Sequence, residues 1–188
     1  MKNLLSLLFW KIQSFQKFFI NHYQRNLFFQ NKNSKIHFSF KLGNDNSLKI
    51  NPEALFFIKE NVVIDQNNFI TVKKGAKLNI GKDSYITRAT ISCLGEIEIG
   101  ENCILGEGMK LFDHNHHYVN NPFYVSKTEF NIGKIKIGNN VWTGANVTIL
   151  KDVIIGDNCI IGAGCVIHKD VPSNSIIINK QDHILKSL

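Results

Sequence analysis

Three of the chain's seven histidines stand within four positions, in the stretch LFDHNHH that runs from Leu111 to His117. These residues are His114, His116 and His117. An imidazole titrates near neutral pH, so it can act as a general base, and its neutral form is a common ligand of zinc. The spacing His-x-His favours a chelate, whereas a stretch rich in polar residues is also typical of a solvated loop. The stretch by itself leaves three alternatives open: a metal site, a catalytic base, or a loop without chemistry.

A six-residue repeat frames this stretch. From Ile137 the sequence divides into IGNNVW, TGANVT, ILKDVI, IGDNCI, IGAGCV and IHKDVP. The fifth position of every unit is small and apolar, and the first is aliphatic in all units except the one that begins with Thr143. Two inward-facing positions per unit are therefore predicted. The first positions are Ile137, Thr143, Ile149, Ile155, Ile161 and Ile167, and the fifth are Val141, Val147, Val153, Cys159, Cys165 and Val171.

The same period appears upstream, so the repeat covers roughly residues 50 to 178. First positions recur at Ile58, Ile64, Ile70, Ile80, Ile86, Ile99, Leu105 and Leu111. A period of six fits neither the 3.6-residue turn of a helix nor simple strand alternation over such a length. It predicts short strands joined by tight corners and stacked in successive coils, which is an all-β solenoid. The expected domain organisation is an N-terminal segment over residues 1–48, the repeat domain over 49–178 and a tail over 179–188.

The repeat breaks once, directly after the histidine stretch. Leu111 and Ile137 are 26 residues apart, which is not a multiple of six. The residues from about 113 to 133 are therefore predicted to form a loop extruded from the coils. Long loops held at both ends by rigid elements often carry function.

The four cysteines are predicted to be buried apolar residues. Cys103, Cys159 and Cys165 occupy the fifth, inward position of a unit, and Cys93 lies six residues before Ile99. No Cys-x-x-Cys pair occurs, which disfavours a zinc ribbon. In a chain without a recognisable signal peptide, disulfides are also not expected.

The net charge of +7 is confined to the first 50 residues, which hold eight Lys and Arg against Asp45 alone. The rest of the chain is neutral, so a nucleic-acid partner is not expected. Apolar residues at Leu8, Ile12, Phe15, Phe19 and Tyr23 predict an amphipathic helix. Lysines within it disfavour a signal peptide or a membrane span. We expect a cytoplasmic protein, with peripheral contact of residues 1–30 with the inner membrane face as one role of the helix and a core or subunit contact as the other.

The stretch from Ile135 to Ile177, IKIGNNVWTGANVTILKDVIIGDNCIIGAGCVIHKDVPSNSII, is similar to the hexapeptide-repeat acetyltransferases, in particular the maltose, galactoside and capsular polysaccharide O-acetyltransferase branch. This resemblance implies a left-handed parallel β-helix, a homotrimer with sites between subunits, and acetyl coenzyme A as the acyl donor. It implies an O-acetyltransferase for a sugar hydroxyl, with no metal.

The resemblance also implies a set of site residues. The family's catalytic histidine aligns with His116, which would take the hydroxyl proton during direct transfer in a ternary complex, with Asp113 or Asn115 as orienting residues. A backbone amide at Gly144 or Ala145 would stabilise the oxyanion. The expected contacts with acetyl coenzyme A are Trp142, Gly144, Ala145, Ala163, His168, Lys169 and Lys186.

The acceptor is expected to be a sugar of a bacterial surface glycan or its precursor. Positions that carry polar acceptor contacts in the maltose and galactoside branch are Ile86 and Leu94 here, so another sugar is expected, and Arg88 is a candidate contact for an anionic one. The alternatives are an amino-sugar N-acetyltransferase, a zinc enzyme like the gamma carbonic anhydrases, and a scaffold without activity. The sequence does not explain Thr143, whose hydroxyl needs a partner if it faces inward.

Overall fold

The structure, a computed structural model, describes residues 6, 8–12, 15 and 33–180. Residues 6, 8–12 and 15 are helical, and their side chains are exposed. The remainder of the expected N-terminal helix, the expected membrane contact and Lys186 fall on residues outside this set. Within the described residues, no helix has the length and apolar character needed to cross a membrane.

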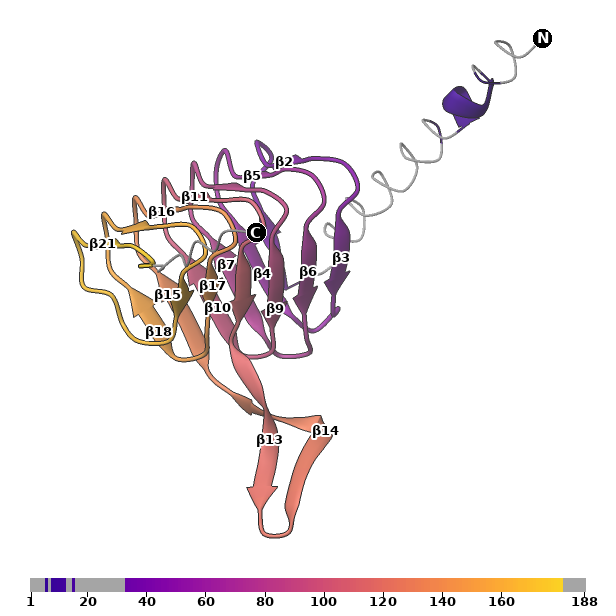
Figure 1. Cartoon of the computed structure of the whole chain (residues 1–188). Coiled ribbons are helices and arrows are strands. Elements are labelled where there is room, and N and C mark those ends of the chain that lie inside the picture. The colour runs from indigo at the N-terminus through magenta and orange to yellow at the C-terminus, as the bar shows by residue number, and fades with distance from the viewer. Residues whose placement is uncertain (1–5, 7, 13–14, 16–32, 181–188) are drawn as a thin grey trace, which may run out of the picture.

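The described chain from Lys35 onward forms a parallel β-helix, as expected, in which three sheets make the faces of a triangular solenoid (Figure 1). Face A contains β1 (Lys35–Ile36), β4 (Leu55–Ile58), β7 (Lys77–Ile80), β10 (Glu96–Ile99), β15 (Lys134–Ile137) and β18 (Val153–Ile155). Face B contains β2 (Lys41–Leu42), β5 (Val63–Ile64), β8 (Tyr85–Ile86), β11 (Ile104–Leu105), β16 (Trp142–Thr143), β19 (Ile160–Ile161) and β21 (Ile176–Ile177). Face C contains β3 (Ser47–Ile50), β6 (Phe69–Val72), β9 (Thr90–Cys93), β12 (Lys110–Phe112), β17 (Thr148–Ile149) and β20 (Val166–Ile167).

The six-residue repeat holds closely in the C-terminal coils and loosens toward the N-terminus. Trp142 pairs with Ile160, so one coil there takes 18 residues, or three repeats. Leu55 pairs with Lys77, so the earlier coil takes 22. The first coil begins at Lys35, whereas the repeat domain was expected from residue 49. Its strands β1, β2 and β3 have two, two and four residues, so its apolar positions do not keep a six-residue count.

The interior is a stack of the inward positions that the repeat predicts. Every first and fifth position named above is buried, and all four cysteines are free thiols in this core. Burial raises the pKa of the Cys93 and Cys103 thiols, so both stay protonated and unreactive. The cysteine prediction is confirmed.

The corners of the coils use a left-handed backbone conformation that favours Asn, Asp and Gly. The A–B corner has positive φ at Asn61, Asp83, Asn102, Asn140, Asn158 and Asn174. The B–C corner has it at Asp45, Asn67, Arg88, Gly108, Asn146 and Gly164. Arg88 is the exception at the B–C corner. Its long side chain stands in the left-handed conformation that the other coils give to Asn, Asp or Gly.

Thr143 finds its partner in the preceding coil. Its side chain is fully buried, and Oγ1 accepts a hydrogen bond of 3.0 Å from the Gly106 amide. The hydroxyl also lies 3.6 Å from the Met109 sulfur, toward which it donates. The hydroxyl thus satisfies a corner amide of the neighbouring coil, which an aliphatic residue could not do.

The extruded segment is a β-hairpin rather than an irregular loop. β13 (His114–Asn120) and β14 (Phe123–Ile132) pair antiparallel and project away from the coils at the C–A corner, between β12 and β15 (Figure 1). The Gly133 amide donates to the Asp113 carbonyl at 2.7 Å and closes the base of the hairpin. The hairpin strands run from His114 to Ile132, in the region where the extruded loop was expected over about 113 to 133.

A cluster of charged side chains on face A makes the stability of the fold depend on pH in the acid range. Glu96 accepts hydrogen bonds from Lys134 and Lys77, each at 2.7 Å, and these lower its carboxyl pKa from an ordinary 4.5 to about 2. Because the folded-state pKa is depressed, this stabilisation is complete above pH 4.5 and is lost as the pH falls toward 2. We expect Glu96→Gln to flatten the fall of the thermal midpoint between pH 5 and 2. An unchanged slope in the variant would show that other carboxylates control acid unfolding.

Candidate functional site

The base of the hairpin holds a histidine oriented by a buried carboxylate. Asp113 is fully buried, and its oxygens accept hydrogen bonds from the amides of Leu94 and Gly95 at 2.8 to 3.0 Å. Asp113 Oδ1 also lies 2.9 Å from His114 Nδ1, and the His114 side chain is 14% exposed. A carboxylate bound in this way can only accept, so His114 carries its proton on Nδ1 and presents the lone pair of Nε2.

His116, the residue that the alignment favours as the base, is oriented differently. Its Nδ1 donates to the Ser126 carbonyl on the opposite strand at 2.9 Å, which also leaves Nε2 as the acceptor. His116 is exposed, and the ring of Phe130 lies 4.7 Å from its ring and 5.2 Å from that of His114. Neither expected orienting residue contacts it: Asp113 binds His114, and Asn115 is exposed.

The third histidine, His117, is half-buried and lies 3.3 Å from Asn131 through Nδ1. The three rings therefore have three separate partners. Over residues 33–180 and the few helical residues before them, no three His, Cys, Asp or Glu side chains are grouped to hold a metal ion.

Trp142 lies on face B and points outward, with 52% of its surface exposed. It belongs to a column of outward residues that are paired from coil to coil and are largely apolar. The column comprises Val63, Tyr85, Ile104, Trp142, Ile160 and Ile176. The outward orientation expected of Trp142 is present, and face B offers an apolar surface around it.

Gly144, Ala145 and Ala163 lie together at the B–C corner of consecutive coils. Gly144 allows the two coils to approach, because a Cβ there would lie 2.7 Å from the Ala163 amide nitrogen. The Gly144 amide donates to the Ile161 carbonyl at 2.7 Å, so it is already used by the coil. In the described coils the Ala145 amide has no such partner, so of the two expected donors it is the one whose N–H is not already used.

The remaining expected contacts are spread over other parts of the solenoid. His168 and Lys169 are exposed at the C–A corner that follows β20. Arg88 lies at the B–C corner, where its guanidinium pairs with Glu107 of the next coil. The single chain therefore does not gather the expected residues into one cleft.

The distance between the histidines and the Ala145 corner is set by the width of face C. About six residues at roughly 3.3 Å each separate the two corners, which amounts to about 20 Å. A general base and an oxyanion donor must both lie within about 3 Å of the reacting atoms. In one protomer the two groups cannot serve the same reaction.

The sequence analysis did not identify the Asp113–His114 pair or the role of the Ser126 carbonyl. The sequence did contain a usable signal for this pair: Asp113 and His114 are adjacent and come directly after the repeat run that ends at the inward Leu111. A polar residue at such a corner can turn back and bind the backbone of the coil. The Ser126 carbonyl had no signal, since it depends on the register of the hairpin.

Residues 134–169 match the model of the bacterial transferase hexapeptide, six repeats. A Bacillus subtilis (strain 168) protein named as an acetyltransferase, YvoF, is 37% identical over 82 residues, covering 44% of this chain and 42% of the relative. The polysialic acid O-acetyltransferase of Neisseria meningitidis is 42% identical over 65 residues, covering 33% and 28%. The crystal structure of a maltose O-acetyltransferase from Clostridium difficile 630 is similar with a TM-score of 0.50 and 25% identity, covering 73% of this chain and 64% of that chain.

The chain spans less than two thirds of the length of the curated relatives it matches. The matched repeats are the coils that carry Trp142, Ala145 and Ala163, directly after the histidine hairpin. Fold, repeat and relatives agree: the chain is a hexapeptide-repeat protein related to the acetyltransferases that are built on this β-helix.

Proposed function

We propose that the protein transfers an acetyl group from acetyl coenzyme A to a sugar hydroxyl of a bacterial surface glycan or its precursor. The observation that carries this proposal is the Asp113–His114 pair at the base of the hairpin, together with relatives named for O-acetyl transfer to polysialic acid and maltose. Since acetyl coenzyme A is a cytoplasmic metabolite, the reaction belongs in the cytoplasm.

The geometry favours His114 over His116 as the base. When the base takes the hydroxyl proton it becomes an imidazolium, which a carboxylate on Nδ1 stabilises more than a carbonyl does. Asp113 is itself fixed by the amides of Leu94 and Gly95, so the His114 ring is held by the coil rather than by the hairpin alone. His116, the candidate from the alignment, remains the alternative, because its Nε2 is also free to accept.

The reaction needs no acyl-enzyme. His114 Nε2 removes the hydroxyl proton while the oxygen attacks the thioester carbonyl, and the proton then passes to the departing thiolate. The Ala145 amide supports the oxyanion, as its N–H is free of the coil ladder. The four thiols are buried and the pKa of two is raised, which argues against a covalent cysteine intermediate.

The two halves of the site come from different copies of the chain. Because about 20 Å separates His114 from Ala145 in one protomer, the hairpin of one copy reaches the B–C corner of another. Exposed apolar side chains on the hairpin and on face B, such as Phe123, Tyr124 and Trp142, supply the surface for such an assembly. A closed ring of three, as the resemblance implies, would give three equivalent sites.

Transfer of radiolabelled acetyl from acetyl coenzyme A to acidic and neutral oligosaccharides tests the function. We expect a labelled product whose acetyl group is released by mild alkali, which cleaves an ester. A product stable to mild alkali would identify an amino-sugar N-acetyltransferase instead. Failure to bind acetyl coenzyme A in a calorimetric titration would reject the enzyme altogether.

Arg88 is proposed to select an anionic acceptor, since it lies on the same corner as Ala145, two coils earlier. Arg88→Asn is expected to keep or raise the thermal midpoint, because Asn suits the positive φ of 47° and the exposed pair with Glu107 contributes little. The same variant should lower kcat/KM for a carboxylate-bearing acceptor about tenfold, the value of one charge-assisted hydrogen bond. Equal losses on acidic and neutral acceptors would contradict this selective role.

A further inference from the structure

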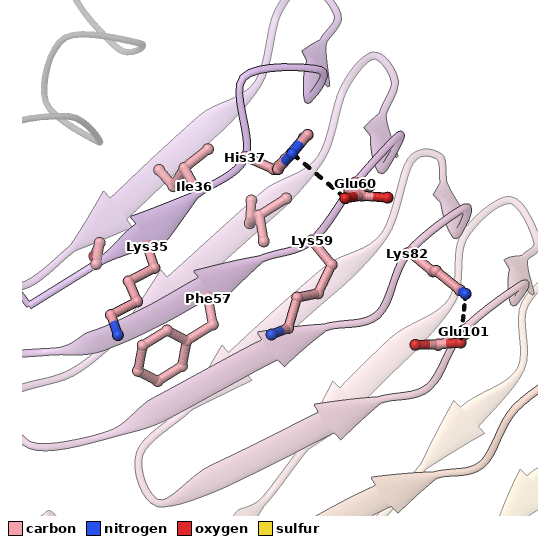
Figure 2. Close-up of a pocket in the computed structure, with 10 residues that line it drawn as sticks. Lys35, Ile36, His37, Phe57, Lys59, Glu60, Lys82 and Glu101 are labelled. Carbon is pink, nitrogen blue, oxygen red and sulfur yellow. Dashed lines mark ion pairs between the residues drawn. The ribbon is translucent and has the colours of Figure 1, made fainter.

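A groove of about 730 Å³ lies on face A at the N-terminal coils (Figure 2). Its apolar lining residues are Ile36, Phe57 and Ile58. Its rim is charged, with the basic residues Lys35, His37, Lys59 and Lys82 and the acidic residues Glu60 and Glu101. None of these residues has a part in the proposed acetyl transfer.

The centre of the groove is an aromatic ring between two ammonium groups. Lys35 on β1 is the register partner of Phe57 on β4, and Lys59 follows Phe57 by two residues, so all three side chains point outward from the same face. Figure 2 shows the Phe57 ring between the two lysine side chains. Phe57 is half-buried and both lysines are exposed.

These two lysines differ from their neighbour on the same face. Lys77 binds both Glu96 and Glu98, at 2.7 and 3.0 Å. Among the described residues, neither Lys35 nor Lys59 has a carboxylate partner within ion-pair distance. Two free cations beside an aromatic ring can receive an anionic ligand without first breaking an existing pair.

The carboxylates of the rim are held only loosely. Glu60 lies 3.6 Å from His37, and Glu101 lies 3.4 Å from Lys82, with exposed side-chain fractions of 61% and 48%. Exposed pairs of this kind contribute little stability, so both carboxylates can accept hydrogen bonds from a ligand. Carboxylates accept hydrogen bonds from sugar hydroxyls, and they repel the multiply charged diphosphate of a nucleotide more than the single carboxylate of one sugar residue. The mixed charge of the rim therefore favours an acidic sugar over a nucleotide.

Two buried oxygens near the ring are also unsatisfied. Ser34 Oγ, which lines the groove, and Asn79 Oδ1, whose residue is the register partner of Phe57 on β7, have no hydrogen-bond partner in the described structure. Both atoms are closed off from solvent, so they are unsatisfied polar groups beside the groove and do not count as contacts with a ligand.

We propose that this groove binds a carboxylate-bearing segment of a glycan, with a sugar ring on Phe57 and its carboxylate on Lys35 or Lys59. The proposal rests on the proposed function only for the choice of ligand, since it makes the groove a second subsite for the same acceptor chain. Face A borders the C–A corner from which the hairpin leaves. At about 4.8 Å per coil, the groove lies roughly 10 to 15 Å along the axis from the hairpin base, a span that a short oligosaccharide can cover.

Calorimetric titration of the full chain with tetragalacturonic acid, in the absence of acetyl coenzyme A, tests the site. We expect Lys35→Gln/Lys59→Gln to weaken binding by about tenfold or more, as each lost charge-assisted hydrogen bond costs about that factor. Phe57→Leu, which keeps an apolar residue on the strand, should weaken it as well. The matched control is Lys41→Gln/Lys49→Gln, which removes the same charge from the first coil on faces B and C.

An equal loss in the control pair would overturn the proposal, because it would indicate unspecific attraction to a basic end of the molecule. Binding of maltotetraose with the same affinity would overturn the anionic requirement, and tight binding of UDP that is lost in Phe57→Leu would assign the groove to a nucleotide instead. The measurement is repeated with His114→Ala, which should bind the acidic tetrasaccharide normally. If the native chain binds the acidic tetrasaccharide but transfers no acetyl group to any acceptor, the proposed acetyltransferase activity is rejected and the proposed binding groove is kept. If it transfers acetyl groups but does not bind the tetrasaccharide, only the proposed groove is rejected.

Discussion

His114→Ala is expected to lower kcat by about 10² to 10⁴, the usual contribution of a positioned general base, with little change in the thermal midpoint. The ring of His114 is 14% exposed and packs edge-on near Phe130, so its removal leaves the coils intact. The loss should appear in kcat rather than in the KM for acetyl coenzyme A, since the base acts on the acceptor proton. Steady-state kinetics and a melting curve on the same preparation measure both quantities.

Two matched variants separate a base from a structural residue. Asp113→Asn keeps the size of the side chain but removes the charge that stabilises the imidazolium, so it should also lower kcat. His116→Ala removes an exposed ring bound to the Ser126 carbonyl and should cost less than tenfold. If His116→Ala abolishes turnover while His114→Ala does not, the assignment from the alignment is correct and ours is wrong.

The fold could be predicted almost entirely from the repeat, because the first and fifth positions of each six-residue unit are the side chains that face inward. Ile137, Thr143 and Ile149 are six residues apart and all are buried, as a coil with three short strands requires. The prediction weakened before residue 58 for a physical reason. Coils of 22 residues still stack by backbone hydrogen bonds, as between Lys35 and Phe57, but their strand lengths no longer give a constant period.

The candidate site was less accessible from sequence. The segment that breaks the repeat could be located, and Trp142 was placed outward correctly, but which histidine meets a carboxylate depends on how Asp113 turns back to the amides of Leu94 and Gly95. The hydrogen bond of the Gly144 amide to the Ile161 carbonyl, which makes Ala145 the proposed donor, is likewise a property of the neighbouring coil. Such contacts depend on which residues of neighbouring coils lie side by side, and a single sequence does not show this alignment of the coils.

Mixing two inactive variants is expected to restore activity if, as proposed, the base and the oxyanion donor come from different copies. His114→Ala lacks the proposed base, and Ala145→Phe places a bulky ring at an exposed position of the B–C corner, so it should block the donor without disturbing the core. Each variant alone should be inactive. When the two are co-expressed in equal amounts and assemble at random in a closed ring, about one quarter of the sites carry an intact His114 and an intact Ala145.

The size of this recovery is the informative quantity. A site built within one protomer would give no recovery at any mixing ratio, because each variant would then carry its own defect in every site. A recovery near one quarter at equal amounts, falling as either variant is diluted, requires a site shared by two copies. The control is a mixture of His114→Ala with Asp113→Asn, whose defects lie on the same hairpin and should not complement. The roughly 20 Å width of face C is the reason for proposing a shared site, since no side chain in one protomer can span it.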